Sequence, residues 1–372
     1  MRQAWRSGRR EEHGRAWLGI PEKKAVSVHI RAKAPLRLSF AGGGTDVSPF
    51  LEREGGCVLS ATISRYSWGT LTPRGDDQIH IESADLGALF YFDTHSNLVY
   101  DGKLDLAKAA IRKVGEPNGK GFDLFLQTDA PPGSGLGSSS SLMVNLIGLL
   151  REFKSLPLTE YETAELAYQI ERKELSIRGG MQDQYAAAFG GFNFIEFSAD
   201  RVIVNPLRIH RDTANELEHN LLLCYTGKPR ATDGIIEDQV GRYEHHEARA
   251  IEGLRHQKTL AVEMKNLLLQ RRLEDFGAKL DEAWQFKKQI SPKISNPHID
   301  EMYEEARRNG ALGGKITGAG GGGYLLFYCE YEKKHKVAEA VKKLGGAPTE
   351  FGFEFHGLQT WRRNGHSRNG NG

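Results

Sequence analysis

A run of glycines and serines at residues 131–141 is the part of this sequence best suited to chemistry; it reads Pro-Pro-Gly-Ser-Gly-Leu-Gly-Ser-Ser-Ser-Ser. The run follows residues typical of a strand and precedes residues with helical spacing. Glycines let the backbone approach a ligand, and the unpaired N–H groups at a helix start attract phosphate. Serine hydroxyls there can bind Mg²⁺ or phosphate oxygens. The pattern indicates a site for nucleotide phosphates; a flexible loop with serine caps is the alternative.

The same run differs from two widespread nucleotide-binding patterns. It does not contain the Gly-x-x-x-x-Gly-Lys-Ser/Thr sequence of P-loop NTPases. It also lacks the Gly-x-Gly-x-x-Gly pattern of dinucleotide-binding proteins, in which a later acidic residue binds the ribose. A P-loop NTPase and a dinucleotide-dependent oxidoreductase therefore both fit the sequence poorly.

Two further glycine-rich segments lie elsewhere in the chain. Residues 313–323 precede a strand-like run at 324–329, and holding so many glycines in order costs conformational entropy. A close approach of this backbone to a ligand or to another loop would explain that cost. The segment at 41–46 ends in Asp46, whose carboxylate can accept hydrogen bonds from sugar hydroxyls. The alternative for Asp46 is an N-cap of a helix at 47–53.

The elements that position these segments are mostly short strands in the first half of the chain and helices in the second. This order favours an α+β protein of two domains over regular βαβ alternation, and we place the boundary near Pro206, between domains at 27–205 and 206–362. Helical spacing is found at 104–114, 142–153, 159–175, 235–289, 298–308 and 334–344. Strand-like runs are found at 28–32, 36–40, 57–63, 67–72, 78–82, 122–128, 192–197, 202–204, 221–225, 324–329 and 350–355.

Composition sets limits on function. The 372 residues include 50 Lys and Arg against 48 Asp and Glu, a net charge of +2 that gives no general basis for binding nucleic acid or membranes. No apolar run reaches the ~18 residues of a membrane span. The three cysteines form no CxxC pair and lie in apolar runs, which is typical of buried thiols in a reducing compartment. We expect a cytoplasmic protein without a structural zinc site.

The two ends differ in composition from the body of the chain. Residues 1–26 are basic with few apolar positions, and no apolar stretch follows that would make them a secretory signal. We expect a disordered extension there; a nucleic-acid-binding arm is the alternative. Residues 363–372 are polar and rich in glycine and asparagine, so we expect them to be disordered as well.

Three segments together, in this order, resemble the motifs of the GHMP kinase family, which includes galactokinase, homoserine kinase and mevalonate kinase. They are Lys-Ala-Pro-Leu-Arg at 33–37, the serine-rich run at 131–141 and the glycine-rich run at 315–323. The likeness covers roughly residues 28 to 360. Within the family, the segment at 179–184 resembles that of the sugar kinases. Among those, the segments at 42–46, 182–185 and 225–230 are most similar to those of the D-glycero-D-manno-heptose 7-phosphate kinases. The basic residues 1–26 have no counterpart in the family pattern.

The resemblance implies a ribosomal-protein-S5-like N-terminal domain and a ferredoxin-like C-terminal domain with the active site between them. It also implies ATP and Mg²⁺ as cofactors, with the metal held by Ser139 and Glu171. The alternative for Glu171 is a solvated charge on a helix surface. The expected ATP-binding residues are Pro132, Gly133, Ser134, Gly135, Leu136, Gly137, Ser138, Ser139 and Ser140, with Gly318 and Gly320.

Asp183 is the candidate base for the acceptor hydroxyl, with Arg37 beside it; the alternative for Asp183 is a loop cap. The implied reaction transfers the γ-phosphate of ATP to the anomeric hydroxyl of D-glycero-D-manno-heptose 7-phosphate. Another sugar such as L-fucose or galactose, or a catalytically inactive sensor, remains an alternative. We expect only small-molecule partners, no nucleic acid, no membrane, and a monomer or homodimer. The expected substrate-binding residues are Gly44, Thr45, Asp46 and Gln182, with Lys228 and Arg230 for the acceptor phosphate, and Arg65 or Arg178 as weaker phosphate candidates.

Overall fold

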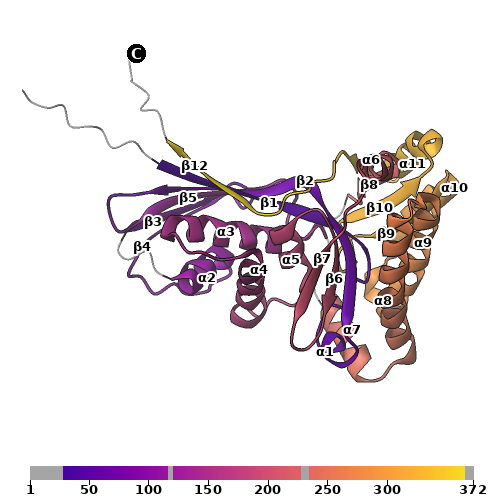
Figure 1. The fold of residues 1–372 in the computed structure, drawn as a ribbon, viewed down its shortest axis with the longest axis horizontal. Coiled ribbons are helices and arrows are strands. Elements are labelled where there is room, and N and C mark those ends of the chain that lie inside the picture. Colours follow the sequence, from indigo (N-terminus) through magenta and orange to yellow (C-terminus); the bar gives the residue numbers. More distant parts are fainter. Residues whose placement is uncertain (1–27, 116–119, 228–233, 365–372) are drawn as a thin grey trace, which may run out of the picture.

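The computed structural model describes residues 28–115, 120–227 and 234–364, which form two sheets with helices packed on them (Figure 1). The larger sheet has eight strands in the order β12-β1-β2-β5-β3-β4, and β6 joins β2 and carries β7. All of its pairs are antiparallel except β3 with β5. The strands are β1 (Val28–Ala41), β2 (Gly56–Pro73), β3 (Gln78–Ser83), β4 (Ala88–Asp93), β5 (Phe122–Thr128), β6 (Phe192–Phe197), β7 (Val202–Pro206) and β12 (Gln359–Asn364).

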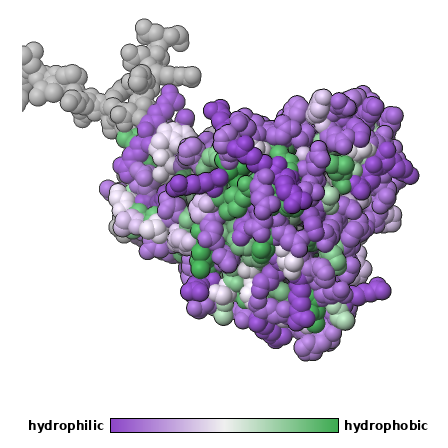
Figure 2. Space-filling model, turned by 45° about the vertical axis from the view of Figure 1, so that its right-hand side comes forward, coloured by the Kyte–Doolittle hydropathy of each residue, from purple (hydrophilic) through white to green (hydrophobic). Residues whose placement is uncertain are grey.

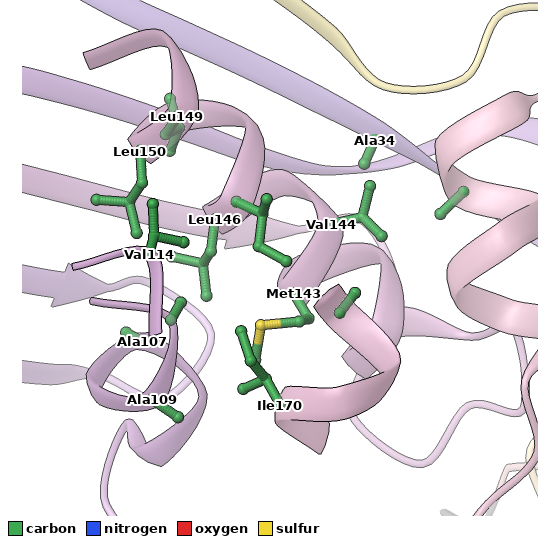
Figure 3. Close-up of a cluster of buried hydrophobic side chains, with 14 of the residues drawn as sticks. Ala34, Ala107, Ala109, Val114, Met143, Val144, Leu146, Leu149, Leu150 and Ile170 are labelled. Carbon is green, nitrogen blue, oxygen red and sulfur yellow. The ribbon is translucent and has the colours of Figure 1, made fainter. Parts of the chain in front are cut away.

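One face of this sheet is covered by helices, as Figure 1 shows. The helix α3 packs on β1 and β2, and its apolar side chains fill the core between helix and sheet (Figure 3). The helices of this half are α1 (Phe50–Glu54), α2 (Asp105–Val114), α3 (Ser138–Lys154), α4 (Glu160–Tyr168), the π-helix Gln169–Glu174 that continues α4, and α5 (Gln182–Phe189).

The smaller sheet is four-stranded and antiparallel in the order β11-β8-β10-β9. Its strands are β8 (Leu221–Tyr225), β9 (Ala311–Ile316), β10 (Tyr324–Cys329) and β11 (Ala347–Thr349). The helices of this half are α6 (Arg211–Asn220), α7 (Ile235–Glu244), α8 (Ala248–Leu269), α9 (Leu273–Ile290), the 3₁₀ turn Pro292–Ile294, α10 (Pro297–Arg308) and α11 (Tyr331–Lys343).

The helices α8 and α9 connect the two sheets. The helix α8 contacts β1 and β2, and α9 contacts β9, β10 and β1. A shared apolar core results, in which the rings of Phe40 from β1 and Phe276 from α9 meet edge to face at 5.3 Å.

Figure 2 shows hydrophobic residues gathered in strips between hydrophilic ones on one face of the molecule. None of the helices in the part of the chain that the structure describes has the length and apolar character of a membrane crossing.

The α+β prediction is confirmed, while several local predictions differ. The predicted strands at 28–32 and 36–40 are one strand, β1, with an irregularity between Pro35 and Leu36, and those at 57–63 and 67–72 are likewise one strand, β2. The strand predicted at 350–355 is wrong: only Phe353 there forms an isolated bridge, to Ile63. Residues on either side of it form β11 and β12 instead.

The C-terminal strand β12 belongs to the first sheet. The predicted boundary at Pro206 remains a prediction, but β12 pairs with β1 and so joins the first sheet rather than the second half. Arg363 and Asn364, which we expected to be disordered, pair with His29 and Val28 in that ladder. Residues 1–26 lie outside the described residues.

Candidate active site

The predicted glycine-rich segments converge on one cavity of about 550 Å³ between the two halves of the molecule. The end of β1 and the turn after it form one wall, the start of α3 a second, and α5 a third. The helix α9 and the loop after β9 close the cavity from the other half. The lining residues that the sequence predicted are Arg37, Gly44, Asp46, Gly133, Gly135, Gly137, Ser138, Ser139, Ser140, Glu171, Gln182, Asp183, Gly318 and, as a weaker candidate, Arg178.

The phosphate loop, residues 131–141, is held by backbone contact with the second glycine-rich segment. Gly135 has φ of +79°, and a Cβ atom there would lie 2.6 Å from the carbonyl oxygen of Thr317. A Cβ on Gly318 would lie 2.7 Å from the Cα of Gly135. The two loops touch at positions where only glycine fits. This close contact explains why the segments contain so many glycines although ordering them costs conformational entropy. Ser138, Ser139 and Ser140, the first residues of α3, line the cavity, and the N–H groups of a first helical turn suit an anion.

Glu171 is buried, so the alternative of a solvated surface charge is wrong. The π-helix that follows α4 brings Glu171 to the start of α3, where Ser139 Oγ donates a hydrogen bond of 2.9 Å to its Oε1. Gln184 Nε2 donates to the other oxygen, Oε2, at 2.6 Å, and also to Ser140 Oγ. One hydroxyl and one carboxylate, next to a phosphate site, fit Mg²⁺, which takes its remaining ligands from phosphates and water.

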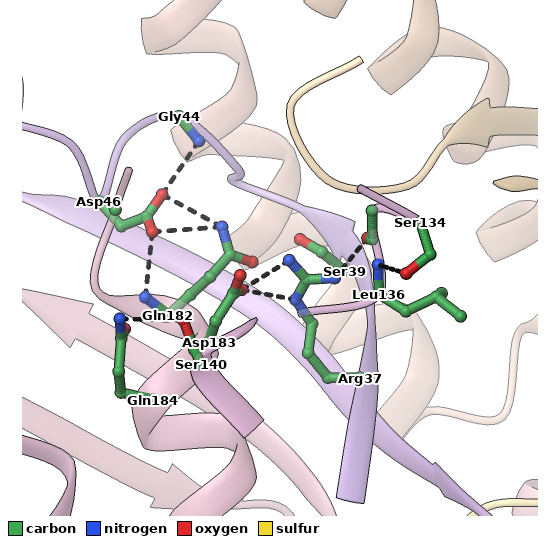
Figure 4. Close-up of polar contacts among 12 residues, drawn as sticks. Arg37, Ser39, Gly44, Asp46, Ser134, Leu136, Ser140, Gln182, Asp183 and Gln184 are labelled. Carbon is green, nitrogen blue, oxygen red and sulfur yellow. Dashed lines mark hydrogen bonds and ion pairs between the residues drawn. The ribbon is translucent and has the colours of Figure 1, made fainter. Parts of the chain in front are cut away.

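Asp183 and Arg37, which both line the cavity, form an ion pair (Figure 4). Arg37 Nε donates to Asp183 Oδ1 at 2.7 Å, and Arg37 Nη1 donates to the carbonyl oxygen of Gly135 at 2.7 Å. A Cβ atom built on Gly137 would lie 3.3 Å from Asp183 Cγ, so the carboxylate lies directly beside the phosphate loop. Asp183 belongs to the first turn of α5, and its side chain is ion-paired rather than serving as a loop cap.

Asp46 does not cap the short helix α1, because Pro49 is the N-cap residue and no side chain caps that end. Its carboxylate instead accepts hydrogen bonds from the backbone N–H groups of Gly44 and Gln182 at 3.0 Å each, and from Gln182 Nε2 at 3.2 Å (Figure 4). These bonds fix the turn after β1 against the start of α5. Asp46 therefore positions Gln182 at the cavity wall.

Several predicted site residues lie behind the wall rather than in it. Thr45 is fully buried, and its hydroxyl bonds the carbonyl oxygens of Gly42 and Cys57. Ser134 and Leu136 are buried within the phosphate loop, and Gly320 packs against Ile294 rather than against that loop. These residues shape the loops and do not line this cavity.

Among the predicted phosphate contacts, Lys228 and Arg230 lie outside the described residues. Arg178 lines the cavity at its edge, where its side chain is 74% exposed and 3.8 Å from Glu237. Arg65 bonds the carbonyl oxygens of Asp129 and Glu350 and does not line the cavity.

Two lysines that the sequence analysis did not assign lie at the site. Lys287 of α9 lines the cavity and is only 4% exposed. Lys315 of β9 is buried behind it and donates a hydrogen bond of 2.7 Å to the carbonyl oxygen of Ser39. Burial, together with the charges of Lys287 and Arg37, lowers the pKa of Lys315 well below its usual value. Lys287 continues the stripe of α9 that includes Leu280, Ala283 and Ile290, all buried, whereas the partly exposed Lys288 does not. The helical spacing could therefore have marked it as a lysine on the buried face.

A second cavity of about 440 Å³ adjoins the phosphate loop on its other side. It shares Gly133, Ser138, Ser139 and Ile177 with the first cavity, and it includes the predicted residue Pro132. Its wall is mainly apolar and is formed by Leu104, Leu106, Leu126, Leu142, Leu146 and Leu175. An apolar ring can therefore lie in the second cavity, next to the residues of the phosphate loop that both cavities share.

Matches to known proteins agree with this arrangement. The model of the GHMP kinases N terminal domain matches residues 102–191, and that of the GHMP kinases C terminal matches residues 264–347. The chain is 41% identical over 337 residues to the D-glycero-alpha-D-manno-heptose 7-phosphate kinase of Campylobacter jejuni, which covers 90% of this chain and 99% of that protein. It is 28% identical to the L-fucokinase/L-fucose-1-P guanylyltransferase of Bacteroides fragilis, covering 85% of this chain and 36% of that protein.

Solved structures show the same fold. A D-glycero-D-manno-heptose 1-phosphate kinase from Bacteroides thetaiotaomicron superposes with a TM-score of 0.75 at 37% identity, covering 89% of this chain and 98% of that one. The fold and the loop-lined cavity define a small-molecule phosphotransferase, and the chain belongs to the GHMP kinase family. Within that family it is a sugar kinase.

Proposed function

We propose that this protein transfers the γ-phosphate of ATP to the anomeric hydroxyl of D-glycero-D-manno-heptose 7-phosphate, giving the 1,7-bisphosphate and ADP. The observation that carries the proposal is the position of Asp183, whose carboxylate lies against the phosphate loop while Arg37 bridges it to Gly135. An acceptor hydroxyl held by Asp183 would face a phosphate held by that loop.

The nucleotide would lie across the phosphate loop. The apolar second cavity suits the adenine base, and the N–H groups at the start of α3 suit the triphosphate. Ser139 and Glu171 would hold Mg²⁺, which neutralises charge on the phosphates when it is bound.

Asp183 would accept the proton of the anomeric hydroxyl as the new bond between that oxygen and the γ-phosphorus forms. The bond from the γ-phosphorus to the bridging oxygen of ATP breaks, and its electrons leave with ADP. Arg37 orients the carboxylate and lies close enough to the loop to stabilise charge on the transferring group. The reaction therefore depends mainly on positioning and electrostatics.

The choice of acceptor is supported by the similarity to the heptose phosphate kinases. The names of the two heptose kinases cited above differ in the position of the phosphate, 7 in one and 1 in the other. Only the 7-phosphate leaves the anomeric hydroxyl available for transfer. We therefore propose the 7-phosphate as substrate, with residues 27–205 contributing most of the nucleotide site.

The test is ADP release with a panel of acceptors: D-glycero-D-manno-heptose 7-phosphate, the free heptose, L-fucose and galactose. We expect kcat/KM to be highest for the heptose 7-phosphate, and ³¹P NMR of the product to show a phosphate on the anomeric carbon. Preferential turnover of L-fucose or galactose would overturn the assignment of the acceptor. Binding of ATP without turnover of any sugar would favour an inactive sensor.

A further inference from the structure

Gly43 is a glycine that the fold itself does not require. Its neighbours Gly42 and Gly44 have φ of +85° and +104°, which strongly favours glycine. Gly43 has no such φ, and a Cβ atom there would meet its nearest neighbours at 3.4 Å or more, which is ordinary contact. An alanine would therefore fit the protein. The cavity wall is therefore open at Gly43, the one of these three glycines whose backbone would tolerate a side chain.

Two polar side chains lie beside this opening. The position of a Cβ on Gly43 is 3.6 Å from Gln182 Nε2 and 3.9 Å from Lys287 Nζ. Both side chains line the cavity. Gln182 Oε1 accepts no hydrogen bond from the described residues and has almost no exposed area, so a sugar hydroxyl would reach it only after the side chain turned toward the cavity.

Lys287 supplies the positive charge beside this opening. It reaches the cavity from α9, in the second half of the chain, and its 4% exposure places the ammonium in a largely water-excluded position. A phosphate bound there would gain more than it would at an exposed lysine. Arg178, by comparison, is 74% exposed and faces Glu237.

Resting on the proposed function, we infer that Lys287 binds the phosphate that the acceptor already carries, and that Gly43 keeps open the space in which the acceptor lies between Lys287 and Gln182. The transferring phosphate lies at the Asp183 end and the acceptor phosphate at the Gly43 end. The enzyme thereby selects a phosphorylated sugar through a residue of α9, separate from the nucleotide loop.

The first test compares Lys287→Met with Lys288→Met, the adjacent lysine whose side chain is 30% exposed and lies 3.8 Å from Asp300. We expect Lys287→Met to raise KM for heptose 7-phosphate by about 10- to 100-fold, as loss of a charged hydrogen bond does, and KM for the free heptose by less than about 3-fold. KM for ATP should not change, and Lys288→Met should behave like the wild type. An equal rise for both sugars, or a rise in KM for ATP, would overturn the inference.

A second pair of variants does not alter the buried lysine and keeps the test decisive if Lys287→Met fails to fold. Gly43→Asp and Gly43→Asn place side chains of the same size beside Lys287, but only one is charged. We expect Gly43→Asp to raise KM for heptose 7-phosphate at least about 10-fold more than Gly43→Asn does, because a carboxylate there repels phosphate. The two should affect free heptose alike.

Equal effects of the two Gly43 variants on both sugars would contradict a phosphate at this position. Failure of the wild type to phosphorylate any sugar would overturn the proposed function itself. If the wild type turns over the sugar but KM for heptose 7-phosphate is the same within each pair of variants, only the inference about Lys287 and Gly43 is overturned.

Discussion

At the scale of single residues, the proposed reaction depends on the carboxylate of Asp183 beside the phosphate loop. We expect Asp183→Asn to lower kcat by about 10²–10⁴-fold with little change in KM for ATP, because the amide keeps the shape but cannot take a proton. The measurement is steady-state kinetics of ADP release. Asp212→Asn, at an aspartate 79% exposed on α6, is the matched control and should leave kcat unchanged. Equal kcat values for the wild type and Asp183→Asn would exclude the proposed base.

Gln184 acts through its neighbour Glu171. Its side-chain amide donates to Glu171 Oε2 at 2.6 Å and so orients the carboxylate that would bind Mg²⁺. We expect Gln184→Ala to raise the Mg²⁺ concentration for half-maximal rate by about 10-fold, while kcat at saturating Mg²⁺ changes much less. The control is Gln169→Ala, at an exposed position whose side-chain amide donates to Glu165. A loss of kcat that excess Mg²⁺ does not restore would argue for another role.

At the scale of elements, the site depends on two loops that touch backbone to backbone. We expect Gly135→Ala to raise KM for ATP at least about 10-fold and to lower the melting temperature, because its Cβ would lie 2.6 Å from the carbonyl oxygen of Thr317. Gly87→Ala is the control: φ is +55° there, but nothing lies within 4 Å of the added atom. It carries the backbone strain without the clash. Equal effects of the two variants would show that the loops do not need each other.

The positions of most elements could be predicted from the sequence because their apolar spacing matches the face that they bury. The exceptions have physical reasons. The strand β12 lies at the edge of the sheet and pairs only with β1 among the described strands. Its residues are mostly polar, so its sequence resembles that of a loop. Glu171 belongs to a charged run typical of a solvated helix, and only the π-helix turns it inward.

The site itself was predicted where residues form local motifs and missed where they meet from distant parts of the chain. Ser139, Asp183 and Arg37 lie in or beside recognisable segments, and the structure brings them together. Lys287 lies on the apolar stripe of α9, which marks it as inward-facing, but the helix belongs to no recognisable motif, and the packing of α9 on the first half is what brings it to the cavity.

At the scale of the whole molecule, the C-terminal segment returns to the first sheet through Glu354. This carboxylate accepts a hydrogen bond of 2.6 Å from Tyr66 and lies 3.5 Å from Lys33. Burial would raise the pKa of Glu354, but the bonds from Tyr66 and His356 and the charge of Lys33 outweigh it and lower the pKa to about 2. Because the folded pKa lies below that of the unfolded chain, this stabilisation is present above about pH 4.5 and is lost toward pH 2.

We therefore expect Glu354→Gln to lower the free energy of unfolding by about 1–2 kcal/mol at pH 7, with the difference from the wild type shrinking as pH falls from 4.5 toward 2. Denaturant unfolding at several pH values measures this. Glu350→Gln, at an exposed position of the same segment, is the control. A difference that stays constant with pH would mean that the charge of Glu354 does not stabilise the fold.

The most direct test of whether Asp183 holds the anomeric hydroxyl beside the γ-phosphate is the structure of a complex with a non-hydrolysable ATP analogue, Mg²⁺ and D-glycero-D-manno-heptose 7-phosphate. The account predicts the anomeric oxygen about 3–3.5 Å from the γ-phosphorus and within hydrogen-bond distance of the Asp183 carboxylate. A sugar bound with its anomeric oxygen beyond the reach of Asp183, or a triphosphate bound away from the phosphate loop, would contradict it.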